Sequence, residues 1–188
     1  MRVLLLRTSL WRVGFVALFT LLATGCAQIE WLVSADDVLF ELTARMAVRW
    51  RDESVSGNVA WRHRQKNSEM VFTSALGSTI ARLIEDPSGV QLTAADGTVH
   101  QARDAATLTQ SILGFPVPLS ALSDWVRARP SPSSEAVVER DAYGRPTALT
   151  QAGWRVEYSA YDNQGRPLRL RVSRPEIELR LAISEWKR

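Results

Sequence analysis

The sequence has one cysteine, two histidines and no apolar run long enough to span a bilayer. A single cysteine excludes an internal disulfide, and His63 and His100 are too few for the clustered His/Cys sets that bind zinc. The sequence also lacks a Gly-rich Walker loop for nucleotide phosphates and a Gly-x-Ser-x-Gly elbow for a nucleophilic serine. We therefore expect no enzyme activity, no catalytic residue, no metal and no cofactor, and we interpret both histidines as surface residues of strands.

An excess of one charge is also missing once the N-terminal segment is set aside. Arg2, Arg7 and Arg12 are three of the 23 basic residues, and all 20 acidic residues follow Cys26. Residues 26–188 therefore carry 20 residues of each sign, and the net charge of +3 belongs to the N-terminal segment. This balance gives no indication of nucleic-acid binding.

The N-terminal segment has the pattern of an export signal. Its basic head is followed by an apolar run at 13–25, which has 13 residues, whereas a bilayer span needs about 20. Small residues then precede Cys26, which resembles the lipobox of bacterial lipoproteins, whose cysteine is acylated after the signal is removed. The alternatives are a transmembrane anchor, for which the run is short, and a free thiol, a liability in an oxidising compartment. We predict a signal peptide at 1–25, lipid attachment at Cys26 and a tether at 26–35.

The tether carries two further indications. In enterobacteria, an Asp directly after the acylated cysteine tends to hold a lipoprotein at the inner membrane, so Ala27 favours the outer membrane. At the end of the tether, Ser34, Asp36 and Asp37 are predicted to cap a short helix that carries Leu39 on its apolar face.

Residues 36–188 are expected to form a single, mainly β domain. Apolar residues alternate with others along 40–51, which is the pattern of a strand with one buried and one exposed face. Asp52–Gly57 is expected to be a turn, and the Asp-Gly pair at 96–97 indicates a hairpin. We predict about 10–11 strands, at 40–51, 58–63, 70–73, 79–84, 90–93, 98–101, 135–140, 148–151, 154–161, 168–172 and 177–186.

Two short helices are predicted to interrupt the strands. Asp104 is the expected N-cap of the first helix, Leu108 lies at helical spacing on its apolar face, and Gly114 ends it. Residues 115–118 are expected to be extended, because two prolines at this spacing exclude a regular helix. Ser120 is predicted to cap the second helix.

This arrangement predicts an unclosed antiparallel β-barrel with the short helices covering an apolar cavity. A long antiparallel sheet with one apolar face curls, and two short helices cannot fill its interior as a packed core would. Six tryptophans lie in the mature sequence; aromatic residues at strand positions are ordinarily core residues, and lining of the cavity is the alternative for Trp31, Trp50, Trp61, Trp125, Trp154 and Trp186. Leu76, in the small-residue turn at 74–78, either packs back on the sheet edge or protrudes toward a membrane.

Several segments match one known family. The most specific is Leu-Gly-x-Pro-x-Pro-Leu at 113–119, with Trp125 behind it, and the sequence departs from the family at Ala44, which is often Gly, and at Ala75, which is often Pro. The other matching segments are 40–48, 57–61, 75–78 and 183–186. On these residues the mature sequence resembles, over nearly all of its length, the LolB family of outer-membrane lipoprotein receptors.

The resemblance implies a function and site residues. It implies a receptor that accepts triacylated lipoproteins from the soluble periplasmic carrier LolA and inserts them into the inner leaflet of the outer membrane. It also implies that Trp61, Trp125 and Trp154 contact acyl chains in the cavity, and that Leu76 is the tip of a membrane-insertion loop. We expect a lipid-anchored monomer at the periplasmic face of the outer membrane. The alternative is a structural or assembly lipoprotein with a filled core, which would bind partner proteins at a sheet edge.

Overall fold

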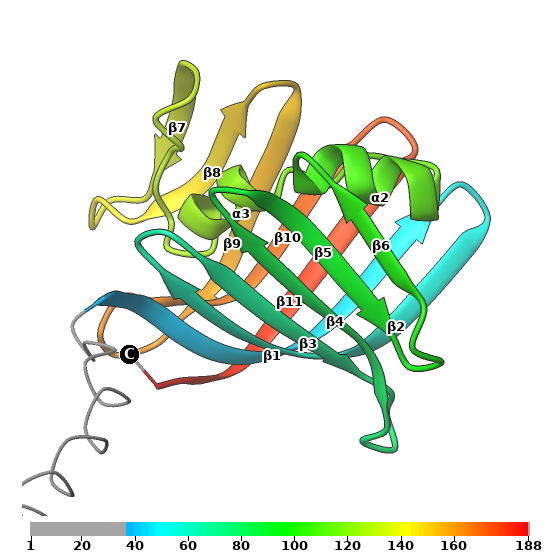
Figure 1. Ribbon diagram of the computed structural model, residues 1–188. Helices are drawn as coiled ribbons and strands as arrows, with labels where there is room; N and C mark the ends of the chain where they lie inside the picture. Colours follow the sequence, from blue (N-terminus) through cyan, green and yellow to red (C-terminus); the bar gives the residue numbers. More distant parts are fainter. Residues whose placement is uncertain (1–36, 188) are drawn as a thin grey trace, which may run out of the picture. The chain divides into compact units, whose positions relative to one another are not determined.

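The computed structural model describes residues 37–187, which form one antiparallel sheet of eleven strands with two short helices. The elements are β1 (Val38–Trp50), β2 (Glu53–Arg64), β3 (Ser68–Thr73), β4 (Thr79–Asp86), β5 (Gly89–Ala94), β6 (Val99–Ala102), α2 (Ala105–Leu113), α3 (Leu119–Trp125), β7 (Ala136–Arg140), β8 (Pro146–Gln151), β9 (Trp154–Tyr161), β10 (Pro167–Arg174) and β11 (Ile177–Trp186). The strand order is β6-β5-β4-β3-β2-β1-β11-β10-β9-β8-β7, so β6 and β7 are unpaired edges (Figure 1). The sheet is therefore an unclosed barrel, as the sequence predicted.

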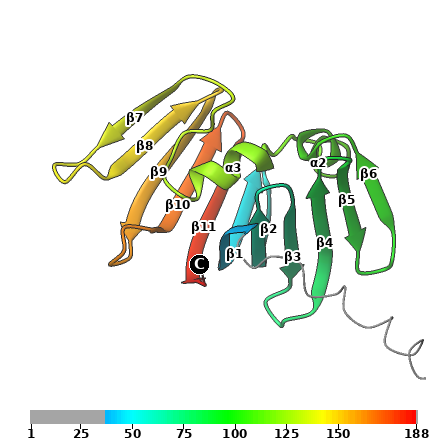
Figure 2. The ribbon, with the colours of Figure 1, turned by 60° about the vertical axis from the view of Figure 1, so that its left-hand side comes forward.

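The first and last strands meet in the middle of the sheet. β1 pairs with β2 on one side and with β11 on the other, where Val48 lies opposite Leu179 (Figure 2). A register shift at Thr43/Ala44 interrupts the β1–β11 pairing. Such a bulge bends the strands and increases their twist.

The period-two pattern of β1 separates two faces of the sheet. Phe40, Leu42 and Ala44 are each 1% exposed on the inner face, whereas Arg45 is exposed on the outer face. The prediction of a short helix that carries Leu39 is wrong, because this residue belongs to β1. The period-two pattern of the strand outweighs the capping signal. Ser34 and Asp36 lie outside the described residues.

The turn predicted at Asp52–Gly57 is also wrong in its length. β2 begins at Glu53, and Val55 already lies opposite Val48 of β1. A turn as short as this requires an unusual backbone conformation, and Arg51 has a φ of 52°. Residues 53–57 therefore extend the hairpin instead of forming a loop.

The helices begin and end where local chemistry requires. The Asp104 carboxylate accepts a hydrogen bond from the Thr107 amide at 2.7 Å, which confirms the predicted N-cap of α2. Gly114 ends the helix with a φ of 81°, and a Cβ at this position would lie 2.8 Å from the Trp50 ring. The predicted cap of α3 is wrong, because Ser120 lies within the helix and Pro118, which has no capping side chain, precedes it.

Both helices lie on the inner face of the sheet (Figures 1 and 2). Leu108 of α2 and Leu122 of α3 are at most 4% exposed and pack in the same core as Leu181 of β11. Burying each such side chain contributes roughly 1.5–3 kcal/mol. No helix within residues 37–187 combines the length and the apolar character needed to cross a membrane.

Candidate functional site

Trp125, the last residue of α3, lies beside Trp154, the first residue of β9, and the two side chains are 0% and 5% exposed. Their ring centroids are 6.3 Å apart. The Trp125 indole nitrogen donates a hydrogen bond to Gln151 Oε1 at 2.8 Å, and the Tyr158 hydroxyl donates to the Trp125 carbonyl oxygen at 2.8 Å. These contacts fix the end of α3 to β8 and β9.

Trp61 belongs to a second aromatic cluster, on β1 and β2. Its ring packs edge-on against Phe40 with the centroids 5.0 Å apart, and its indole nitrogen donates to Ser68 Oγ at 2.7 Å. Phe40 also packs edge-on against Trp186, with the centroids 5.9 Å apart. Trp61 is 2% exposed, so it is as buried as the other two tryptophans but has different neighbours.

Side chains fill the space around all three tryptophans, so here they occupy ordinary core positions. The sequence prediction underestimated the segment that joins the helices, because Phe115 and the partly buried Val117 add to the core that α2 and α3 provide. Two hollows of the described domain lie elsewhere: one of about 500 Å³ on the outer face of β1, β2 and β9–β11, and one of about 370 Å³ lined mainly by charged residues beside the β10–β11 turn. A cavity that admits acyl chains beneath the helices stays a prediction and requires side chains or helices to move.

His63 is half-buried on the inner face, whereas the sequence predicted a surface position; His100 is exposed, as predicted. The His63 ring lies 5.1 Å from that of Phe40, and its Nδ1 atom is buried without a hydrogen-bond partner among the described residues. Burial, and to a smaller extent the positive charge of Arg127, lower the pKa of His63 to about 4. The imidazole is therefore neutral at neutral pH.

A His63→Phe variant is expected to lose less stability on acidification than the wild-type protein. Between the ordinary pKa of 6.5 and about 4, the unfolded chain protonates this histidine and the folded chain does not, so folding stability falls as the pH falls through this window. Phe removes this proton uptake and retains an aromatic ring beside Phe40. Urea unfolding midpoints at about pH 7 and about pH 5 measure the effect. An equal loss of stability in both proteins would contradict it.

Gln151 is a central residue that the sequence analysis missed. It is 2% exposed, and its Oε1 accepts from the Ser131 amide at 2.9 Å in addition to the Trp125 indole. Its Nε2 donates to the carbonyl oxygens of Ser131 and Ser134 at 2.7 and 2.6 Å. The sequence did carry one signal for this role: Gln151 is a polar residue two positions after Leu149, so the two residues share the inward side of their strand.

Leu76 lies at the tip of the β3–β4 loop and is 95% exposed. The loop is closed by hydrogen bonds from the Ser74 amide to the Ser78 carbonyl oxygen at 2.8 Å and from the Gly77 amide to the Ser74 carbonyl oxygen at 3.0 Å. The Asn58 side chain donates to the same Ser74 oxygen at 3.2 Å and ties the loop to β2. These bonds hold the loop without the proline that the family often has at Ala75. The loop protrudes, and its contact with a membrane stays a prediction.

The remaining sequence predictions concern metals and the lipid anchor. Within residues 37–187, no group of three His, Cys, Asp or Glu side chains is placed to hold a metal ion. Cys26, the tether at 26–35 and the signal peptide at 1–25 lie outside the described residues. Lipid attachment therefore stays a prediction from the sequence pattern.

Comparison with known proteins gives a consistent family. A family model described as "Outer membrane lipoprotein LolB" matches residues 39–186. The chain is 38% identical over 175 residues to the outer-membrane lipoprotein LolB of Azoarcus sp., covering 91% of this chain and 90% of that protein. It is 39% identical over 189 residues to the LolB of Bordetella petrii, covering 93% and 94%.

A solved structure agrees with the fold. A DUF1329 family protein from Desulfovibrio piger is similar with a TM-score of 0.52 and 9% sequence identity, covering 78% of this chain and 84% of that chain. This likeness concerns the fold alone, whereas the sequence matches extend over most of the chain. The chain therefore belongs to the LolB family of outer-membrane lipoproteins.

Proposed function

We propose that this protein receives lipoproteins from a soluble periplasmic carrier of the LolA type and passes their acyl chains into the inner leaflet of the outer membrane. The observation that carries the proposal is the continuous apolar inner face of an unclosed sheet, which two short helices cover within residues 37–187. Membership of the LolB family supports the same function.

The proposed ligands are the acyl chains of a triacylated lipoprotein. One sixteen-carbon chain exposes to water an amount of apolar surface worth roughly 12 kcal/mol, so the chains must pass between apolar sites without entering water. Binding requires side chains or helices to move away from the sheet, since side chains fill the interface in this structure. Trp61, Trp125 and Trp154 would then line the space that opens. The transfer involves no catalysis.

The proposed attachment to the outer membrane uses two features. Acylation of Cys26 would anchor a monomer at the periplasmic face through the tether at 26–35. Leu76 would contact the bilayer at the point of release, because an apolar tip that is 95% exposed gains free energy on entering the membrane interface.

The filled interior favours a second candidate function. A structural or assembly lipoprotein would retain a packed core and bind partner proteins at an open sheet edge. Both edges carry an exposed apolar side chain: Val99 on β6 is 52% exposed and Val137 on β7 is 68% exposed. This function requires no binding of acyl chains, so a transfer experiment separates the two.

The mature chain with Cys26→Ala is expected to take a radiolabelled lipoprotein from a loaded carrier and to form a one-to-one complex with it. The substitution removes the anchor and leaves the described domain unchanged, so the result reports on binding alone. Size-exclusion chromatography of the mixture measures the transfer of label, and circular dichroism confirms that the receiving protein is folded. Label that stays on the carrier, together with failure to bind a fluorescent acyl probe, would support the structural alternative.

A further inference from the structure

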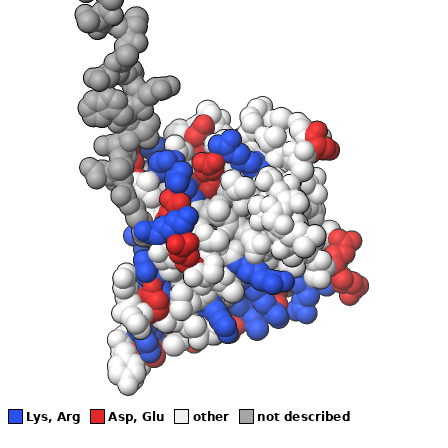
Figure 3. Space-filling view, turned by 90° about the horizontal axis from the view of Figure 1, so that it is seen from below, with Lys and Arg blue, Asp and Glu red and all other residues white. Residues whose placement is uncertain are grey.

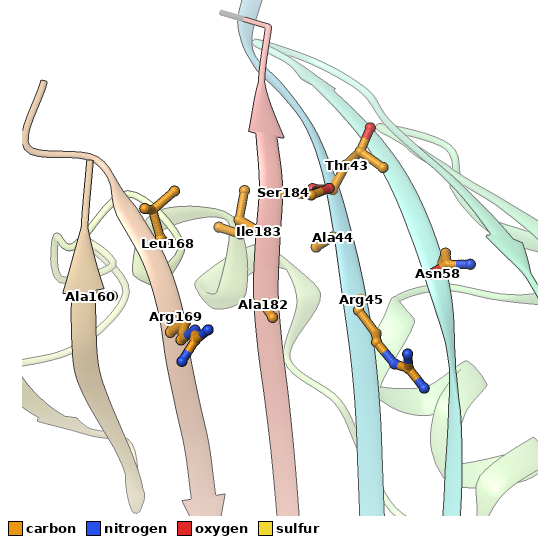
Figure 4. A pocket seen from close by; sticks show the side chains of 10 residues that line it. All are labelled: Thr43, Ala44, Arg45, Asn58, Ala160, Leu168, Arg169, Ala182, Ile183 and Ser184. Carbon is orange, nitrogen blue, oxygen red and sulfur yellow. Dashed lines mark hydrogen bonds between the residues drawn. The ribbon is translucent and has the colours of Figure 1, made fainter. Parts of the chain in front are cut away.

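The outer face of the sheet contains a hollow of about 500 Å³ that the acyl-chain proposal does not use. We refer to it as the outer hollow. Figure 4 shows its lining, with Arg45 and Arg169 on either side of the β11 strand that carries Ala182. Its lining residues are Thr43, Ala44, Arg45, Asn58, Ala160, Leu168, Arg169, Ala182, Ile183 and Ser184.

Strand register explains why the outer hollow forms. Arg169 lies opposite Ala182, and Ala182 lies opposite Arg45, so two long cationic side chains flank one methyl group in a single row across the sheet. Neighbouring strands are about 4.8 Å apart, which places the two arginine Cα atoms about 10 Å from each other. Register shifts at Thr43/Ala44 and at Arg169/Leu170 bend the strands at the same level.

The two arginines of the outer hollow have no carboxylate within ion-pair distance among the described residues. The arginines beside them are different, because Arg49, Arg171 and Arg180 all approach Glu178, at 3.8, 3.5 and 2.6 Å. Figure 3 shows the molecule from below, with Lys and Arg side chains gathered in a band that contains few acidic side chains. The outer hollow therefore combines open space with uncompensated positive charge.

The outer hollow is next to the base of the Leu76 loop. Asn58 lies opposite Arg45 in the same row, and its side chain donates a hydrogen bond to the Ser74 carbonyl oxygen at 3.2 Å. The row continues to Thr73, the last residue of β3 before the loop. A bilayer in contact with Leu76 would therefore lie near the outer hollow.

We propose that the outer hollow binds the phosphate group of an anionic phospholipid in the bilayer that the Leu76 loop contacts. The inference rests on the proposed function, because it takes from it the contact between the loop and a membrane. A guanidinium group presents paired N–H donors that match phosphate oxygens, and two such groups flank a space kept open by Ala182 and Ala160. Headgroup binding would orient the domain so that lipoprotein release occurs at the membrane surface.

An Arg45→Ala/Arg169→Ala double variant of the Cys26→Ala mature chain tests this. Its binding to phosphatidylethanolamine–phosphatidylglycerol vesicles is measured by flotation, with phosphatidylcholine vesicles as the neutral comparison. Each basic residue near an anionic surface contributes roughly a fivefold effect, so the double variant is expected to bind the anionic vesicles about 25-fold more weakly. Its weak binding to the neutral vesicles is expected to be unchanged.

A matched Arg103→Ala/Arg155→Ala variant removes the same charge at two exposed positions outside the outer hollow. This variant should retain most of the binding to anionic vesicles. An equal loss of binding in both double variants would mean that net charge alone causes the effect, and would overturn the proposed site. Binding of millimolar inorganic phosphate to the two arginines in the absence of vesicles, with release of bound vesicles when phosphate is added, would assign the site to free phosphate. That result would also overturn the proposal. The proposed function is tested separately by the transfer of radiolabelled lipoprotein. Label that stays on the carrier would refute acyl transfer, and vesicle binding that depends on the two arginines could persist in that case.

Discussion

A Leu76→Glu variant is expected to accept a lipoprotein from the carrier and to fail to insert it into a bilayer. The leucine side chain is 95% exposed, so the substitution removes no contact from the core. Burying a leucine in an apolar environment is worth up to about 3 kcal/mol, and its loss corresponds to roughly a 100-fold slower insertion. The glutamate would also repel an anionic membrane surface. Flotation of radiolabelled lipoprotein with vesicles, after transfer from the carrier, measures insertion separately from acceptance.

Two further variants make this result specific. Val137→Glu places the same charge at an exposed apolar residue on the edge strand β7, so it should insert lipoproteins normally. Leu76→Phe keeps an apolar tip on the same loop and should retain most of the activity. Normal insertion by Leu76→Glu would exclude the loop from the release step, and loss of acceptance would move its role to carrier docking.

Local pattern was sufficient to predict most of the strands but not the pairing of the first strand with the last. The alternation along β1 and β11 identifies two strands with one apolar face each, and both were expected at nearly the observed positions. Their pairing at the centre of the sheet is a contact between residues at opposite ends of the domain, and no local pattern encodes it. The row formed by Arg169, Ala182 and Arg45 depends on that pairing, so the outer hollow could not be predicted from the sequence.

The candidate site was only partly predictable for a related reason. The turn of small residues around Leu76 left two positions open, packed on the sheet edge or protruding, and only the resemblance to the LolB family favoured the protruding position that the structure shows. The burial of Trp125 depends on where α3 rests on the sheet, and Gln151 fixes that position from a distant strand. Helix length alone suggested an unfilled interior. The extended segment with Phe115 fills part of the interior between the helices and the sheet. Whether such a segment enters the core depends on the path of the chain between α2 and α3.

A Trp125→Ala variant is expected to lower the free energy of unfolding by about 3–5 kcal/mol. The side chain is 0% exposed, so its removal leaves a cavity between α3 and Trp154 and deletes the hydrogen bond to Gln151. Trp125→Phe keeps the six-membered ring and loses the five-membered ring with its N–H donor, so the free energy of unfolding should fall by a smaller amount, about 1–3 kcal/mol. Urea unfolding followed by circular dichroism measures both values.

Tyr143→Ala serves as the matched control, because this aromatic side chain is 85% exposed and its removal should change the stability by less than about 0.5 kcal/mol. The comparison bears on how the protein could open for acyl chains. A loss near 4 kcal/mol for Trp125→Ala would mean that α3 is fixed to the sheet chiefly through this residue, so opening must displace Trp125 or leave α3 in place and move α2. A loss below about 1 kcal/mol would contradict the prediction, and would mean that α3 can leave the inner face without disturbing the core.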